Sequence, residues 1–190
     1  MENRLYIVKY SGPFGFIKPW TAVRDEKTYS QQFLTPSIIE GLRQRLGVSA
    51  ILRHKLMHAG TSLQQERTQS RAFETKKKSG KIYATRAQSI ISRGIMLEPH
   101  VWLAFPTLND AELALEQHIC LSRNEDILLP DPSILELTKD EFNEMPGFEL
   151  VFGQTENSIL VGHNRYKENE PMYGEIKITG NPILDLRLEI

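Results

Sequence analysis

Histidine is the side chain best suited to proton transfer near neutral pH, and three histidines of this sequence stand beside cations. His54 and His58 flank Lys55, and His163 precedes Arg165 by two residues. Metal-independent RNA cleavage uses such a pair, because a histidine serves as general base and a cation stabilises the pentavalent phosphorus. The chain has five histidines, so such clusters also arise without a function. An endoribonuclease therefore stays open as an alternative, with His54, His58 and His163 as its candidate catalytic residues.

The same histidines match no metal or cofactor motif. His54 and His58 are four residues apart, but the segment HKLMH lacks the glutamate of the zinc-protease helix, and no third ligand is marked. The single cysteine, Cys120, has no second thiol to pair with. The sequence contains no glycine-rich phosphate loop, nucleophile elbow or dinucleotide fingerprint. We therefore expect neither a metal nor an organic cofactor.

Positive charge is concentrated in one segment of a chain whose formal net charge is -1. Residues 53–93 contain ten Lys or Arg and two Glu, whereas residues 94–190 contain six basic and eighteen acidic residues. A local excess of basic residues favours binding to a polyanion, because neutralisation of phosphates by Lys and Arg supplies most of the sequence-independent affinity for nucleic acids. Two alternatives stay open: a solvated loop that serves only solubility, and a loop that docks an acidic protein partner.

The stretch before this segment mixes cations with an aromatic side chain. Lys18, Arg24 and Lys27 surround Trp20 in the sequence. Unpaired RNA bases stack on aromatic rings while nearby cations bind the phosphates, which makes these four residues candidates for RNA binding. A place in the hydrophobic core is an equally good interpretation of Trp20.

A helix start supplies a further anion-binding feature. Thr35, Pro36 and Ser37 precede apolar residues at helical spacing, and Gly47 is a stop signal, so the sequence predicts a helix over 36–46. Backbone N–H groups near Thr35 and Ser37 could bind phosphate, or they could belong to an ordinary helix cap. The other RNA-binding candidates lie in the basic segment and are Arg53, Arg67, Gln69, Arg71, Lys76, Lys77, Lys78 and Arg86.

Turn signals and apolar patterns predict the elements that carry these residues. Residues 5–10 indicate a first strand, which we expect in the middle of its sheet. Residues 59–81 are polar and basic, and they contain Gly60 and Gly80 without a helical period. They predict an exposed hairpin or loop.

The second half begins with an apolar strand that ends near residue 105. Thr107 or Asn109 can cap a helix expected over 110–122. Turns, the first at Pro130–Pro132, then alternate with short strands to the end of the chain.

This order of elements predicts the α+β class, with an antiparallel sheet and helices on one face. The length fits a single domain over residues 1–190, in which residues 59–93 form an inserted basic hairpin. No leader pattern opens the sequence, and no apolar run approaches the ~18 residues that span a bilayer. We therefore expect a cytoplasmic protein without membrane contact.

Residues 11–48 resemble the opening of the Cas-five family, a branch of the RAMP superfamily. The similarity combines the turn at 11–13, the apolar segment Phe16–Trp20, the cap Thr35–Ser37 and the helix that contains Gly41. Residues 67–71, the basic insert after them and residues 84–105 are similar to the family's thumb-like hairpin and the core strand that follows it. GFELVFGQTENSILVGH resembles another family segment, although Gln154 and Thr155 replace its usual basic pair.

The resemblance implies a ferredoxin-like or RRM-like fold with an inserted hairpin thumb. It also implies a subunit of a type I or type IV CRISPR effector complex that binds the 5′ handle of the guide RNA. Such a subunit would cap the backbone filament, contact a backbone subunit and the large subunit, and meet target DNA indirectly. Some members of the superfamily cleave precursor RNA instead, which is the endoribonuclease alternative.

Overall fold

The computed structural model describes residues 4–19, 27–164 and 167–184, and for residues 68–73 and 85–89 it describes the backbone alone. Within these residues the elements are, in chain order, β1 (Arg4–Ser11), β2 (Phe14–Gly15), β3 (Lys27–Tyr29), α1 (Pro36–Leu46), β4 (Arg53–Met57), β5 (Gly60–Lys78), β6 (Lys81–Leu97), β7 (His100–Phe105), α2 (Leu108–Leu115), β8 (Ile119–Cys120), β9 (Ile127–Thr138), α3 (Lys139–Glu144), β10 (Gly147–Phe152), β11 (Ile159–Asn164) and β12 (Glu170–Thr179). None of the helices in this described part has the length and apolar composition needed to cross a membrane.

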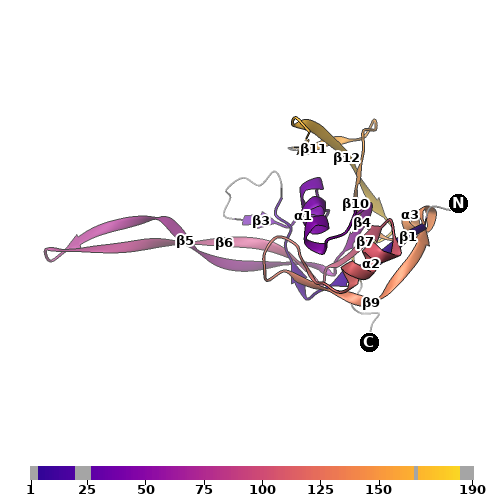
Figure 1. Cartoon of the computed structure of the whole chain (residues 1–190). Helices are drawn as coiled ribbons and strands as arrows, with labels where there is room; N and C mark the ends of the chain where they lie inside the picture. The colour runs from indigo at the N-terminus through magenta and orange to yellow at the C-terminus, as the bar shows by residue number, and fades with distance from the viewer. Residues whose placement is uncertain (1–3, 20–26, 165–166, 185–190) are drawn as a thin grey trace.

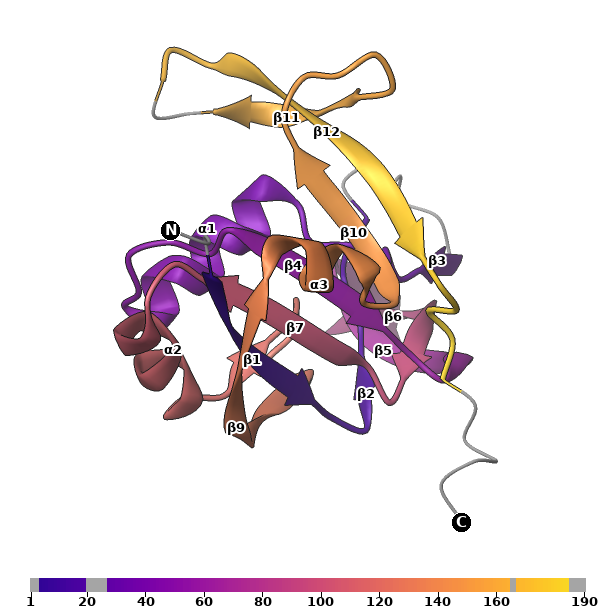
Figure 2. The same cartoon turned by 90° about the vertical axis from the view of Figure 1, so that its right-hand side faces the viewer.

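Six elements build the centre of the molecule, in the chain order β1, α1, β4, β7, α2 and β9. Strands β4, β7, β1 and β9 lie side by side in that spatial order, and each neighbouring pair is antiparallel. Figure 2 shows β1 between β7 and β9, so the first strand is interior, as predicted. The predicted α+β class with an antiparallel sheet is confirmed.

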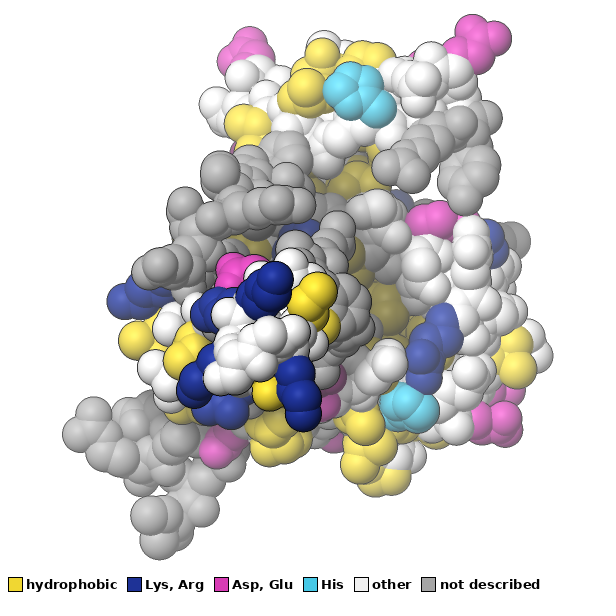
Figure 3. Space-filling model, turned by 90° about the vertical axis from the view of Figure 1, so that its left-hand side faces the viewer, with side chains coloured by type: hydrophobic (Ala, Val, Ile, Leu, Met, Phe, Trp, Pro, Cys, Tyr) yellow, Lys and Arg dark blue, Asp and Glu magenta, His cyan; other side chains and the backbone are white. Residues whose placement is uncertain are grey.

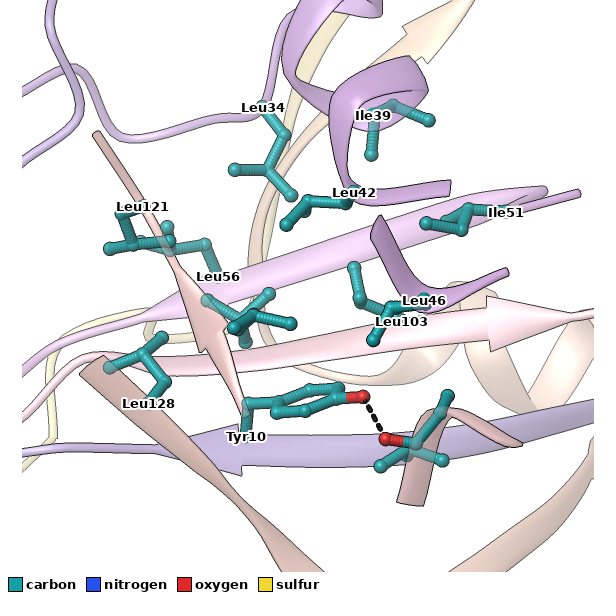
Figure 4. Packing of buried hydrophobic residues seen from close by; sticks show 14 of the residues in the cluster. Tyr10, Leu34, Ile39, Leu42, Leu46, Ile51, Leu56, Leu103, Leu121 and Leu128 are labelled. Atoms are coloured by element: carbon teal, nitrogen blue, oxygen red, sulfur yellow. Dashed lines mark hydrogen bonds between the residues drawn. The ribbon is translucent and has the colours of Figure 1, made fainter. Parts of the chain in front are cut away.

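The first helix has the predicted bounds. Thr35 is its N-cap residue, but the Thr35 hydroxyl lies 3.1 Å from Ser37 Oγ and does not bond a backbone N–H. Gly47 ends the helix in the left-handed conformation, with φ 71°, which glycine adopts without a steric penalty. Ile39 and Leu42 point from α1 into the core (Figure 4).

The main core lies between α1, α2 and one face of the sheet. Val8 and Tyr10 of β1 and Leu103 of β7 are fully buried there. The Tyr10 hydroxyl donates a hydrogen bond to the backbone oxygen of Ala114 on α2, with an O···O distance of 2.6 Å (Figure 4). Burial raises the pKa of Tyr10. The bond satisfies the polar end of a buried ring and links β1 to α2.

The second helix is shorter than predicted. Thr107 caps α2 by accepting a hydrogen bond from the Asp110 backbone N–H at 3.1 Å, but the helix ends at Leu115. Ile119 and Cys120 form β8 instead, paired with β9. Ile119 is fully buried in the main core, so tertiary pairing overrides the helical spacing of the sequence here.

A third helix, α3, covers the opposite face of the sheet (Figure 2). Its Phe142 packs there against Ile7 of β1 and Ala104 of β7. The expectation that helices lie on one face only is therefore wrong for α3. Its sequence signal is a capping box, in which Thr138 and Glu141 each accept a hydrogen bond from the other's backbone N–H.

Strand β9 runs through the two prolines where turns were predicted. Val8 pairs with Ile134, whereas Tyr10 pairs with Pro130, so the register shifts between these two residues of β1. Such a bulge leaves backbone groups outside the ladder, which is where a strand tolerates proline. The predicted turn at Pro130–Pro132 is therefore wrong.

Strands β5 and β6 form a long antiparallel hairpin that projects from the body of the molecule (Figure 1). Pairing runs from Gly60 opposite Leu97 to Lys78 opposite Lys81, with an irregularity between residues 69 and 73. Ser79 and Gly80 make the turn with φ values of 52° and 77°. Two residues with positive φ match the type I′ turn of tight hairpins.

Strands β10, β12 and β11 extend the sheet beyond β4, and we call these three strands the arm (residues 147–180). The order β4, β10, β12, β11 places β11 at the edge. Figures 1 and 2 show the arm rising above the body, away from α2 and β9.

Candidate nucleic-acid interface

The hairpin of β5 and β6 ends in four exposed lysines, Lys76, Lys77, Lys78 and Lys81. None of the described residues forms an ion pair with any of them. We call residues 76–83 the hairpin tip. Its positive charge is open to a ligand from outside the chain.

The strand register divides the hairpin tip into two faces, because directly paired residues of antiparallel strands share a face. Lys76 pairs with Tyr83 and Lys78 pairs with Lys81, whereas the intervening Lys77 pairs with Ile82. Tyr83 thus shares its face with three lysines. Figure 3, which looks onto the tip, shows the basic side chains gathered around it with hydrophobic side chains between them.

This arrangement suits an unpaired nucleic-acid strand. The Tyr83 ring is half exposed, and an aromatic ring on the surface offers a stacking platform for any base. Lysines around the ring neutralise phosphates as mobile point charges, without the forked geometry that arginine offers. The hairpin tip can therefore hold and orient a strand, but its side chains do not read base edges.

A second cation–aromatic pair lies at the base of the hairpin, where β3 runs parallel to β6. Lys27 Nζ is 5.4 Å from the centre of the exposed Tyr29 ring. Tyr29 lies against Gly94 of β6, and a Cβ added at Gly94 would approach the ring to 2.1 Å. Glycine at residue 94 therefore allows Tyr29 to cross the hairpin base.

Two arginines fix the base of the hairpin to the body. Arg93 of β6 pairs with Glu66 of β5 at 2.5 Å, and its guanidinium lies 5.1 Å from the centre of the buried Phe16 ring. Arg123 lies 5.7 Å from the same ring and pairs with Asp126 at 2.6 Å. Each arginine is ion-paired to a carboxylate of the protein, so we assign both arginines a structural role.

The remaining hairpin candidates lie along the two strands. Arg67 is exposed on β5, opposite Ile90. Gln69 and Arg71 on β5 and Arg86 on β6 belong to the hairpin backbone, and their side chains lie outside the described residues. Their contribution to RNA binding stays a prediction.

The candidates before the basic segment do not belong to the hairpin tip. Lys18 is exposed, and its backbone N–H donates to Ser122 Oγ at 3.0 Å. Thr35 is buried and Ser37 is exposed at the start of α1, which lies on the body of the molecule (Figure 1). Trp20 and Arg24 lie outside the described residues.

Arg53 is bound within the protein, which argues against its predicted role in RNA binding. Its Nη2 donates to Glu149 Oε2 at 2.7 Å, its Nε contacts the other carboxylate oxygen, and Nη1 reaches Asn143. Glu149 is buried, and the fully buried Lys55 Nζ lies 3.8 Å from it. Moving Arg53 away would leave the buried Glu149 carboxylate without this ion pair, which is costly. We therefore assign Arg53 a structural role in the sheet.

His54 cannot reach a substrate in this structure. It is fully buried, and its Nε2 accepts hydrogen bonds from the backbone N–H groups of Leu34 at 3.1 Å and Leu150 at 3.3 Å. Burial, followed by the nearby charges of Arg53 and Lys55, lowers the pKa of His54 to about 3. A neutral acceptor held in the core is a structural residue.

The other two histidines do not complete a catalytic cluster with His54. His58 is buried and stacks on Phe148 with 5.9 Å between ring centres, and burial lowers its pKa. His163 is exposed on β11, the edge strand of the arm, whereas His54 lies on β4, with β10 and β12 between these strands. Arg165 lies outside the described residues. Within the described chain, no group of three or more His, Cys, Asp and Glu side chains could hold a metal ion.

The sequence matches no protein-family model and none of the curated proteins. The solved structures that are similar to this chain include one that matches over nearly its whole length, with a TM-score of 0.54 at 11% sequence identity. The similarity covers 94% of this chain and 91% of the other, which belongs to a structure titled "CRISPR RNA-guided surveillance complex". At this identity the likeness shows that the two chains share a fold.

Sequence reasoning missed the aromatic partner of the lysine triplet and the aromatic residue at the hairpin base. Neither aromatic residue is among the RNA-binding candidates that the sequence predicts, although Tyr83 lies directly across the ladder from Lys76. The usable signal was Ser79–Gly80, a turn dipeptide that fixes the register of its flanking residues. No comparable signal pointed to Tyr29, because a parallel pairing with β6 brings it to the hairpin.

Proposed function

We propose that this chain is a guide-RNA-binding subunit of a CRISPR effector complex and that it acts by positioning RNA. Membership of such a complex is supported by the fold that 94% of this chain shares with a chain of a CRISPR RNA-guided surveillance complex. The order β1, α1, β4, β7, α2, β9 supports a ferredoxin-like fold of the RAMP type. The early resemblance to the Cas-five family points to the same superfamily.

The observation that carries RNA binding is the hairpin tip. Four lysines that pair with no acidic side chain of the described residues lie at the end of a projecting hairpin, and three of them share a face with the exposed Tyr83. Residues 59–93 contain eight Lys or Arg and two Glu, whereas the chain is acidic after residue 93, so the hairpin attracts a polyanion. Burial of two of the three candidate histidines favours a positioning role over cleavage.

In this role the subunit would bind the 5′ handle of the guide RNA and cap one end of the backbone filament. The complex would act in the cytoplasm. Tyr83 would stack on one unpaired base while the lysines on its face neutralise the flanking phosphates. The body would contact a backbone subunit and the large subunit, and target DNA would be met through the guide.

Binding of the purified chain to a labelled single-stranded RNA with the repeat-derived handle tests this proposal. We expect tight binding by the wild-type chain and a loss of at least tenfold when Lys76, Lys78 and Lys81 are all replaced by glutamate. Replacement of Lys139, Lys167 and Lys177, three exposed lysines of the carboxy-terminal half, is the matched control and should change the affinity little. Equal affinity of the two triple variants would contradict the proposal.

A precursor assay separates positioning from cleavage. The chain is incubated with repeat RNA in a chelator, and the RNA length is followed on a denaturing gel. We expect binding without cleavage. Cutting within the repeat that the change His163→Ala abolishes would establish the endoribonuclease alternative.

A further inference from the structure

Large apolar side chains are exposed together on one face of the arm. Ile178 and Ile176 of β12 are 62% and 44% exposed, and Ile159 of β11 and Phe152 of β10 are 42% and 37% exposed. We call these four residues the arm face. Figure 3, which views the molecule from the hairpin side, shows hydrophobic side chains on the arm.

The strand register makes the arm face continuous with the main core. Ile176 and Ile178 pair directly with Leu150 and Phe148 of β10, so all four side chains lie on one side of the sheet. Gly174 precedes Ile176 by two residues on β12 and lies on the same side of the sheet. It pairs with Phe152 of β10 and with Ile159 of β11, so these two side chains share that side. Leu150 is buried and Phe148 packs against the core, so the arm face extends the core surface.

The edge of β12 next to the two isoleucines is open. Strand β11 pairs with residues 170–174 of β12, and no strand of the described chain pairs with the outer side of residues 175–179. A hydrophobic strand edge left open in this way promotes aggregation, and proteins normally cover or charge it. Exposed apolar side chains grouped on such an edge indicate an interaction site.

The charge around the arm face selects the kind of partner. Lys177 is exposed between the two isoleucines but belongs to the opposite side of β12. Glu156 is exposed in the turn that joins the strands of Phe152 and Ile159, within a half of the chain (residues 94–190) that carries eighteen acidic and six basic side chains. This charge repels RNA. It favours a protein segment with Lys or Arg next to its apolar side chains.

We propose that the arm face docks an extended segment of another protein subunit, which adds to the open edge of β12. The segment presents apolar side chains at alternate positions, because only every second residue of a strand faces the arm face. Lys or Arg beside them meets Glu156. The proposal rests on the proposed function only in taking the partner from the same complex.

A photo-crosslinking residue at position 178 tests this docking in the intact complex purified through the tagged chain. Position 129 is the matched control, because Leu129 is also 62% exposed but lies on β9. We expect position 178 to give an adduct with a peptide of another subunit that alternates apolar residues and contains Lys or Arg, and position 129 to give none to that peptide. An adduct with RNA or with a second copy of this chain would overturn the proposal, as would no adduct at position 178.

Two charge variants provide a second readout. Ile178→Glu should lower the amount of the crosslinked subunit recovered per chain at least tenfold, while Leu129→Glu leaves it unchanged. Both variants should keep the wild-type circular dichroism spectrum and RNA affinity, because the hairpin tip is untouched. Equal recovery with the two variants would contradict the docking. Co-purifying guide RNA is scored separately: its absence would count against the proposed function, whereas the crosslink decides the docking.

Discussion

At the scale of single residues, Glu149 lies beside two cations for which the sequence predicted separate roles, Arg53 as an RNA-binding candidate and Lys55 as the cation next to His54. Arg53 makes a two-oxygen contact with it, and the buried Lys55 donates to the backbone oxygen of Met145 at 2.9 Å and to Thr179 Oγ1 at 3.0 Å. Burial lowers the pKa of Lys55, and the charge of Glu149 opposes that effect. The carboxylate therefore supports a charged amine that also joins α3 to β12.

Replacing Glu149 by alanine should destabilise the protein by about 3 kcal/mol, because it leaves a buried cation without its counter-charge. Urea unfolding at pH 7.5 measures the change. Glu144→Ala is the control, since Glu144 is exposed at the end of α3 and an acidic side chain there gains nothing from the helix dipole. A loss below 1 kcal/mol for Glu149→Ala would contradict this account of Arg53 and Lys55.

His54 makes stability depend on pH. Its pKa of about 3 in the folded state lies below the ~6.5 of an unfolded chain, so the unfolded state binds more protons between these values. The contribution of His54 to stability is complete above pH 6.5 and is lost as the pH falls toward 3. The lowered pKa of His58 acts in the same direction.

The change His54→Gln should therefore lower stability at pH 7.5, because two backbone N–H groups lose their ring acceptor, and it should flatten the decline between pH 6.5 and 4. Urea midpoints measured in half-unit steps provide both values. Parallel pH profiles for the wild-type and variant chains would mean that His54 is not held neutral in the core.

At the scale of elements, local signals predicted α1 well, because proline, glycine and apolar spacing agree there. They failed where tertiary contacts decide: Ile119 leaves the helical pattern to pair with β9, and β9 passes Pro130 through a bulge. Short α3 escaped notice because its capping box is followed by a single buried side chain, Phe142. Periodicity cannot register so brief an element.

The hairpin base depends on the contact between Gly94 and Tyr29. Gly94→Ala should lower the free energy of unfolding by about 1–3 kcal/mol through overpacking, or displace β3. The reason is that the new Cβ would clash with Cδ1 of the Tyr29 ring. Thermal unfolding measures the cost. Gly94→Ala combined with Tyr29→Ala should recover most of the loss, and a failure to recover would place the strain elsewhere.

The two faces of the hairpin tip provide a matched pair of variants. Tyr83→Ala should weaken single-stranded RNA binding by about 1–3 kcal/mol, the usual value of one stacked base. Ile82→Ala should change it little, because Ile82 lies on the opposite face with a single lysine, although it is the more exposed of the two. Fluorescence anisotropy with one RNA compares them, and equal losses would contradict stacking on Tyr83.

At the scale of the whole molecule, the charge pattern of the sequence predicted the basic hairpin, but it did not predict which hairpin residues form the interface that we propose. Charge counting grouped Arg53 with the hairpin lysines, although buried Glu149 binds Arg53 inside the body. It also could not reveal that Tyr83 faces the lysines, because that requires the strand register. Composition predicts attraction to a polyanion, whereas the fold decides which cations are free.

If the hairpin lysines contact RNA phosphates, the affinity for RNA should depend on the salt concentration, and this dependence should weaken when the lysines are removed. Each phosphate contact adds about 0.7 to the negative slope of log affinity against log salt for a single strand. Replacing Lys76, Lys78 and Lys81 by alanine should therefore reduce the slope by about 2. An unchanged slope would mean that these lysines do not contact phosphates.

Purification of the tagged chain from its native host, followed by sequencing of the bound RNA, tests the central claim most directly. The wild-type chain should recover guide RNAs with intact 5′ handles together with other effector subunits. The variant with Lys76, Lys78 and Lys81 replaced by glutamate should recover at least tenfold less guide RNA per chain. An absence of repeat-derived RNA in the wild-type sample, or equal recovery by the variant, would contradict the assignment of this chain as a guide-RNA-binding subunit that uses its hairpin tip.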